Sequence, residues 1–80
     1  MQTVYERELQ ALKPWDQVQS TRAIGRGYNK IETAGHGYLV VPRGDIFASV
    51  ARKIGASFSG KYAYYLEEDC EMYAFIDAIK

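Results

Sequence analysis

No apolar run in this chain exceeds five residues, and the most informative one lies at positions 38–41 (Tyr-Leu-Val-Val). It begins after Gly37 and ends at Pro42, and a membrane span needs about 20 apolar residues, so the run predicts a strand and no membrane helix. Because its side chains are apolar on both faces, we expect this strand to be buried more completely than a surface strand. Residues 28–33 predict a second strand, and residues 34–37 predict the turn of a hairpin.

The N-terminal part of the chain predicts one helix followed by irregular structure. Residues 3–13 have a helical pattern, because Thr3 and Glu6 have capping-box spacing and the apolar residues at positions 5, 9 and 12 form one stripe. Pro14 ends this helix. Residues 15–27 lack a clear period, and their serine, threonine and glycine residues predict irregular chain. Three apolar residues are the expected buried anchors of that segment: Trp15, Val18 and Ile24.

The C-terminal half predicts a second helix, a third strand and a third helix. Asp45 offers an N-cap for the second helix, whose apolar face includes Ile46 and which Gly55 ends. Residues 61–66 predict an aromatic strand that follows a Ser/Gly loop. Asp69 offers the cap of the last helix, and the carboxylates beside it are stabilised there by the helix dipole.

Eighty residues make one domain, so we expect residues 1–80 to form a single α+β unit in the order α-β-β-α-β-α. A three-stranded, mainly antiparallel sheet packed with three helices is the predicted architecture. In the last helix, the spacing places Met72 on the buried stripe and turns Cys70, Tyr73 and Asp77 to the opposite side.

Charge is distributed unevenly along a chain that is neutral overall. Residues 17–61 carry seven basic and two acidic residues, a net charge of +5. Residues 62–80 carry five acidic residues and one lysine, a net charge of −4, and four of those acids fall within residues 67–71. A basic pole and an acidic pole are typical of a domain that docks on charged partners or on copies of itself.

The start of the chain has neither a basic n-region nor an apolar h-region, so no secretory signal is expected. One cysteine, Cys70, cannot form an internal disulfide, and a reduced thiol indicates a cytoplasmic protein. Because the helical phase turns Cys70 outward, we expect an intermolecular disulfide, and with it a homodimer, under oxidising conditions.

Neither catalysis nor a cofactor is expected. His36, the only histidine, lies among turn glycines, and Cys70 lies on another element among carboxylates that disfavour a thiolate, so a Cys–His nucleophile is not indicated. The acidic residues 67–71 lack EF-hand spacing and accompany no zinc-type His/Cys set, so no metal ion is expected. The two Gly-x-Gly turns lack the full glycine pattern of a phosphate loop.

Two binding hypotheses remain open, beside the plainer interpretation that the acids are solvated capping residues. In the first, carboxylates imitate phosphates and dock on a basic groove, with tyrosines as anchors. Its residues are Glu67, Glu68, Asp69, Glu71, Asp77, Tyr64, Tyr65 and Tyr73. In the second, a basic middle region holds a nucleic-acid backbone. Its residues are Arg22, Arg26, Lys30, Arg43, Arg52 and Lys53.

Two stretches resemble a pattern found in small proteins of phages, prophages and other mobile elements. Residues 33–42 place a Gly-His-Gly turn before the apolar strand, and residues 64–71 run from aromatic residues into Glu-Glu-Asp-Cys-Glu. Within that group the chain resembles anti-CRISPR inhibitors of the type I-C surveillance complex, Cascade. The resemblance implies a non-enzymatic phage protein in the host bacterial cytosol. It would bind Cascade subunits and block target DNA as a DNA mimic.

Overall fold

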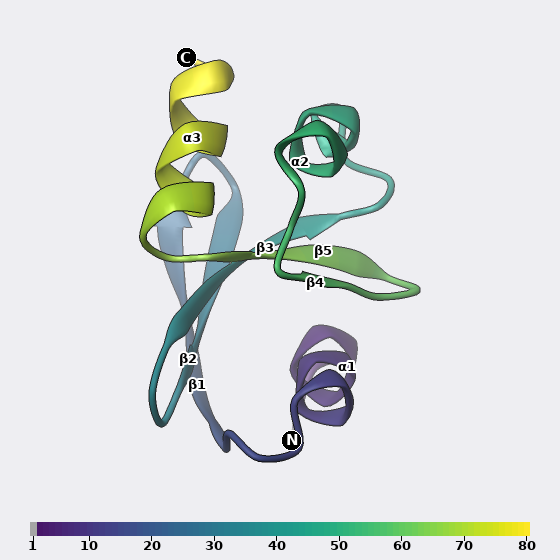
Figure 1. Ribbon diagram of the computed structural model, residues 1–80, viewed down its shortest axis with the longest axis vertical. Coiled ribbons are helices and arrows are strands. Elements are labelled where there is room, and N and C mark those ends of the chain that lie inside the picture. The colour runs from purple at the N-terminus through teal and green to yellow at the C-terminus, as the bar shows by residue number, and fades with distance from the viewer. Residues whose placement is uncertain (1) are drawn as a thin grey trace.

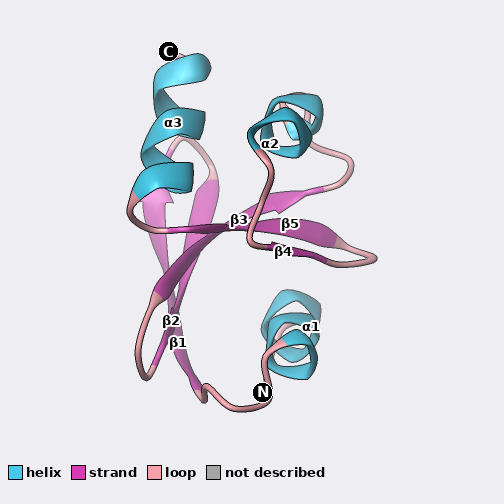
Figure 2. Ribbon diagram, viewed as in Figure 1, coloured by secondary structure: helices cyan, strands magenta, loops and turns pink. Residues whose placement is uncertain are grey.

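The computed structural model describes residues 2–80 and contains a five-stranded antiparallel sheet with helices on both faces (Figures 1 and 2). In chain order the elements are α1 (Val4–Leu12), β1 (Val18–Gly25), β2 (Tyr28–Thr33), β3 (Gly37–Pro42), α2 (Ala48–Ile54), β4 (Phe58–Ser59), β5 (Ala63–Glu67) and α3 (Cys70–Ala78). The strand order is β1-β2-β3-β5-β4, so β3 is central. The α+β class with three helices is confirmed, whereas the prediction of three strands is wrong.

β1 is the largest departure from the prediction, which treated residues 15–27 as irregular chain. The strand pairs antiparallel with β2, and the loop between them consists of Arg26 and Gly27. Both loop residues have positive φ, +56° and +79°, as in the two-residue type I′ turn of a β-hairpin. Residues 19–23 are all exposed, so β1 has no alternating apolar face that a sequence pattern could reveal.

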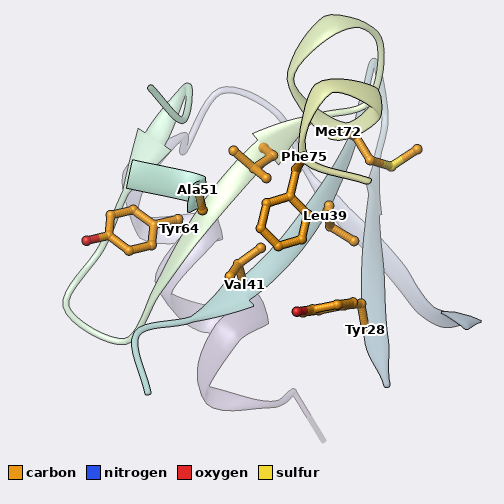
Figure 3. Packing of buried hydrophobic residues seen from close by; sticks show 8 residues of the cluster. Tyr28, Leu39, Val41, Ala51, Tyr64, Met72 and Phe75 are labelled. Carbon is orange, nitrogen blue, oxygen red and sulfur yellow. The ribbon is translucent and has the colours of Figure 1, made fainter. Parts of the chain in front are cut away.

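The central strand β3 is buried on both faces, as its sequence predicts. Leu39 and Val41 belong to the core beneath α2 and α3, whereas Tyr38 and Val40 belong to the core that α1 covers. Phe75 of α3 is fully buried, and Figure 3 shows its ring beside Leu39 and Val41. Burial of a phenylalanine side chain contributes about 2–3 kcal/mol, so this contact fixes α3 against the sheet.

The first helix, α1, follows its prediction closely. Its capping box is present, because the Glu6 N–H donates to Thr3 Oγ1 (3.1 Å) and the Thr3 N–H donates to Glu6 Oε1 (2.8 Å). Leu9 is fully buried, and Tyr5 and Leu12 pack against the same core. Among residues 2–80, no helix has the length and apolar character that a membrane crossing requires.

The second helix, α2, begins at Ala48, later than predicted, and Asp45 is not its cap. The Asp45 carboxylate instead accepts hydrogen bonds from the Tyr28 hydroxyl (2.7 Å) and the Phe47 N–H (2.9 Å), and so braces the loop before the helix. Burial and the hydrogen bond to Asp45 raise the pKa of Tyr28 to about 12. Ile46, expected on the buried face, is 86% exposed in this loop.

The third helix, α3, buries Met72 and exposes Cys70 and Tyr73, as its periodicity predicts. Asp69 precedes the helix, but its side chain makes no capping hydrogen bond, so the predicted cap is wrong. The short edge strand β4 lies in the predicted Ser/Gly loop and pairs with β5. Two residues carry too little periodicity to be recognised as a strand in a sequence.

Candidate binding surface

The two sequence motifs, which about twenty residues separate in the chain, lie side by side in the fold. β3 and β5 are paired strands in which Tyr38 is opposite Glu67. Directly beyond this pair, the Glu68 N–H donates to the Gly37 carbonyl at 2.9 Å. The Gly-His-Gly turn therefore abuts the acidic segment at the junction of β5 and α3. We call the carboxylates gathered here the acidic corner: Glu32, Glu67, Glu68, Asp69 and Glu71.

Lys30 lies beneath the acidic corner and holds two of its members. Its Nζ is 2.8 Å from Glu68 Oε2 and 3.2 Å from Glu32 Oε1, and its side chain is only 5% exposed. The hydrogen bond to Glu68 is the main reason that the pKa of Lys30 is raised above its ordinary value. Gly37 makes room for this ion pair, since a Cβ there would lie 2.6 Å from Lys30 Cε.

Glu71 belongs to the corner but is turned toward the protein's own backbone. Its Oε1 accepts from the N–H groups of Ser57 and Glu67, both at 2.9 Å, and its Oε2 accepts from the Ser57 hydroxyl at 2.7 Å. Three hydrogen bonds leave this carboxylate little capacity for a partner. The prediction that Glu71 contacts a partner is therefore not supported by its geometry, and its visible role is to join α3 to β5.

Glu67 and Asp69 are the acids of the corner that remain most available. Glu67 Oε2 lies 3.6 Å from His36 Nδ1, and both side chains are partly exposed. Asp69 is exposed, and no other described side chain or backbone group pairs with its carboxylate. Asp77 lies at the far end of α3 and pairs with Lys80 at 3.0 Å, so it is separate from the acidic corner.

The three tyrosines predicted as anchors differ in solvent exposure. Tyr64 and Tyr65 are buried in the two cores, 6% and 0% exposed, so neither side chain can anchor a partner. The Tyr65 hydroxyl donates to Glu8 at 2.7 Å, and burial raises its pKa. Strand alternation buries both residues because helices cover both faces of the sheet. Tyr73 is 57% exposed on α3, beside the exposed thiol of Cys70, as predicted.

The basic residues of the second hypothesis are only partly available. Lys30 is buried under the acidic corner. The Arg43 guanidinium lies 4.5 Å from the Tyr64 ring centroid and donates to Gly60, Ser59 and Tyr64, so it closes the turn before β5. Neither cation is free to hold a phosphate. Arg22 lies 3.6 Å from Glu32, and the others are dispersed over the β1–β2 loop and α2: Arg26, Arg52 and Lys53.

A second polar cluster, which the sequence analysis missed, lies on the α1 side of the sheet. Lys13 Nζ is 2.9 Å from Asp16 Oδ2 and also donates to the Tyr38 hydroxyl. Asp16 accepts further hydrogen bonds from Thr33 Oγ1 (2.7 Å) and the Gly35 N–H (3.1 Å). We call these four side chains the buried clamp: Lys13, Asp16, Thr33 and Tyr38. In the sequence, only the i, i+3 spacing of Lys13 and Asp16 indicates this cluster.

The buried clamp fixes the ionisation of its members. The hydrogen bonds from Lys13 and Thr33 lower the pKa of Asp16 from its ordinary value of 3.8 to about 2. Burial by itself lowers the pKa of Lys13, but its hydrogen bonds to Tyr38 and Asp16 outweigh that effect and raise it. The clamp therefore ties the end of α1 to the β2–β3 turn through a pair that is charged at neutral pH.

Within residues 2–80 there is no cavity that could enclose a small molecule, and no group of three or more histidine, cysteine or acidic side chains is placed to hold a metal ion. The candidate functional groups therefore lie on the surface: the acidic corner, the exposed Tyr73 and the exposed thiol of Cys70. No protein-family model matches the chain, and neither a curated protein sequence nor a solved structure matches it.

Proposed function

We propose that the protein is a non-enzymatic inhibitor that binds the type I-C effector complex, Cascade, and blocks its access to target DNA. The observation that carries the proposal is the acidic corner, where side chains from the two motifs meet. Glu67, Glu68 and Asp69 follow one another between β5 and α3; Lys30 holds Glu68, and Glu67 Oε2 lies 3.6 Å from His36 Nδ1. The proposal rests on this geometry together with the resemblance described above.

The acidic corner keeps a net negative charge despite its internal ion pairs. Five carboxylates face two cations, Lys30 and Arg22, which leaves a net charge of −3. A DNA-binding groove is lined by cations, so such a surface is attracted to it by long-range electrostatics. Glu68, which Lys30 holds, also loses less conformational entropy on binding than a mobile carboxylate would, which favours affinity.

The proposed contact set is smaller than the set predicted from the sequence. It contains Glu67, Glu68 and Asp69 as the charged part and Tyr73 as an aromatic contact on the exposed face of α3. Asp77 lies about 12 Å further along the helix, at 1.5 Å per residue, and pairs with Lys80. It therefore serves as a control position for a change of charge.

The test is a pair of charge reversals with the same change in net charge. Asp69→Lys should weaken binding to purified type I-C Cascade by about 10-fold at physiological salt, which corresponds to about 1.4 kcal/mol. Asp77→Lys should weaken it by less than about 2-fold, because that carboxylate is distant and already paired. Binding is measured by biolayer interferometry, and inhibition by a gel shift of Cascade on target DNA.

Equal affinities of Asp69→Lys and the unsubstituted protein would contradict the role of the acidic corner. A Cascade–DNA complex that forms normally in the presence of excess protein would contradict the inhibitory function itself. The same gels include the protein with short duplex and single-stranded DNA alone. Retardation of that DNA would instead favour the nucleic-acid hypothesis, for which Arg26, Arg52 and Lys53 remain available.

A further inference from the structure

The most exposed aromatic side chain in the fold belongs to Trp15, at the tip of the turn between α1 and β1. Its hydrophobic character predicts a buried anchor, but this residue is 74% exposed. Its ring lies near the edge strand β4, where the Phe58 ring centroid is 6.5 Å away. Tryptophan is the residue type most enriched among the dominant contacts of protein interfaces.

The turn that presents Trp15 is rigid. Pro14 fixes one backbone angle, and the Asp16 N–H donates to the Lys13 carbonyl at 3.2 Å, which closes a four-residue turn. The Gln10 side-chain amide bridges both ends of this turn, since it donates to the carbonyls of Lys13 (3.3 Å) and Asp16 (3.2 Å). The backbone at Trp15 is thus fixed before any partner arrives, which reduces the entropy cost of binding.

The turn that carries Trp15 has no free charge of its own. The two ionisable residues of the turn, Lys13 and Asp16, are buried and pair with each other inside the buried clamp. The turn therefore offers no free cation of its own to hold a phosphate beside the indole, as a base-stacking site requires. The complementary partner is an uncharged, apolar pocket on a protein.

The Trp15 turn is continuous with the acidic corner. Asp16 of the clamp accepts hydrogen bonds from Thr33 and Gly35 in the β2–β3 turn. The next residue of that turn, His36, lies 3.6 Å from Glu67 of the acidic corner. One short turn therefore connects the two surfaces, and a central aromatic contact with a charged region beside it is the usual composition of a protein interface.

We propose that Trp15 is the apolar anchor of the docking surface and inserts into an apolar pocket of the same Cascade subunit that faces the acidic corner. This inference rests on the proposed function, which supplies the identity of the partner. A second copy of this chain is the less suitable occupant, because residues 2–80 contain no cavity that could receive an indole ring.

Trp15 is the only tryptophan, so its fluorescence reports directly on its own environment. When a tryptophan-free variant of the Cascade subunit binds, the Trp15 fluorescence should shift and become protected from iodide quenching. Alternatively, 5-fluorotryptophan is incorporated into this protein, and its ¹⁹F NMR signal should shift on binding. Trp15→Ser should weaken binding at least 30-fold. Ile46→Ser removes a similarly exposed apolar side chain from the β3–α2 loop and should change affinity less than 2-fold.

The outcomes separate the anchor from the proposed function. Unchanged affinity of Trp15→Ser, while Asp69→Lys binds weakly, would overturn the anchor alone. No binding of the unsubstituted protein to Cascade would overturn both proposals. A Trp15 signal that shifts with protein concentration in the absence of Cascade, with a dimer in analytical ultracentrifugation, would assign the indole to self-association and also overturn the anchor. Circular dichroism of each variant establishes that it is folded.

Discussion

Two buried lysines in this fold take part in similar ion pairs but have different surroundings. The side chains of Lys13 and Lys30 are each 5% exposed, and each Nζ lies within 2.9 Å of a carboxylate oxygen. Asp16, the partner of Lys13, is itself buried and receives two further hydrogen bonds. Glu68, the partner of Lys30, is 39% exposed and shares its lysine with Glu32.

The difference shows how one kind of ion pair can serve two purposes. In the buried clamp, one cation meets one anion away from water, so the charges cancel and the pair fixes geometry. In the acidic corner, carboxylates outnumber the cation and face the solvent, so the lysine positions them without neutralising the surface.

The largest effect is expected at the buried clamp. Lys13→Met keeps most of the side-chain volume but removes the cation, and leaves the Asp16 carboxylate buried without its counter-charge. Removal of one partner from a buried ion pair costs on the order of 3–5 kcal/mol, and we expect about 3 kcal/mol here. Urea unfolding monitored by circular dichroism measures the change.

The control for this substitution is Lys61→Met, at an exposed position in the turn before β5. The same chemical change there should alter the free energy of unfolding by less than about 0.5 kcal/mol. Similar stabilities of the Lys13→Met and Lys61→Met proteins would show that the clamp is not a buried, tightly coupled pair.

A smaller effect on stability is expected when the pH is lowered, because Asp16 becomes protonated. Its pKa of about 2 lies below the ordinary value of 3.8. The carboxylate therefore stabilises the fold above about pH 4, and this contribution is lost as the pH falls from 4 to 2. Asp16→Asn has no carboxylate that could take up a proton, so its stability should fall less steeply in that interval. Thermal unfolding at pH 2, 3, 4 and 6 measures both slopes, and parallel slopes would contradict the assignment.

Much of the fold was predictable because local patterns agreed with the tertiary structure. The capping box of Thr3 and Glu6, the apolar central strand and the helical stripe that contains Met72 all appear in the structure. β1 was not predictable from periodicity, because a strand exposed on both faces has no apolar alternation. Its evidence in the sequence was the glycine-rich turn at residues 25–27, which adopts positive φ.

The candidate surface was predictable in position but not in detail. The charge distribution along the sequence predicts where the acidic segment lies. It does not predict that the Glu71 carboxylate accepts hydrogen bonds from the backbone N–H groups of Ser57 and Glu67. Burial of Tyr64 and Tyr65 depends on helices covering both faces of the sheet, which is a tertiary property. Trp15 was misassigned for the opposite reason: hydrophobicity alone predicts burial, whereas the rigid turn directs its ring into solvent.

The smallest effect on stability is expected at the acidic corner. Lys30→Met should reduce the free energy of unfolding by only about 1 kcal/mol, because Glu68 and Glu32 are about one-third exposed and water screens them after the lysine is lost. The loss should become smaller in 0.5 M NaCl, where the Debye length is only about 4 Å. A loss as large as that of Lys13→Met would remove the distinction between the two regions.

The same substitution separates two explanations of Cascade binding. Lys30→Met changes the net charge of the acidic corner from −3 to −4 and frees Glu68 from its only ion-pair partner. If net charge alone attracts the partner, affinity should rise; if the fixed positions of the carboxylates matter, affinity should fall. We expect a fall of about 5-fold, because a mobile Glu68 must be ordered again on binding. Biolayer interferometry at 50 and 150 mM NaCl measures it, and a gain in affinity at both salt concentrations would show that Lys30 does not organise the surface.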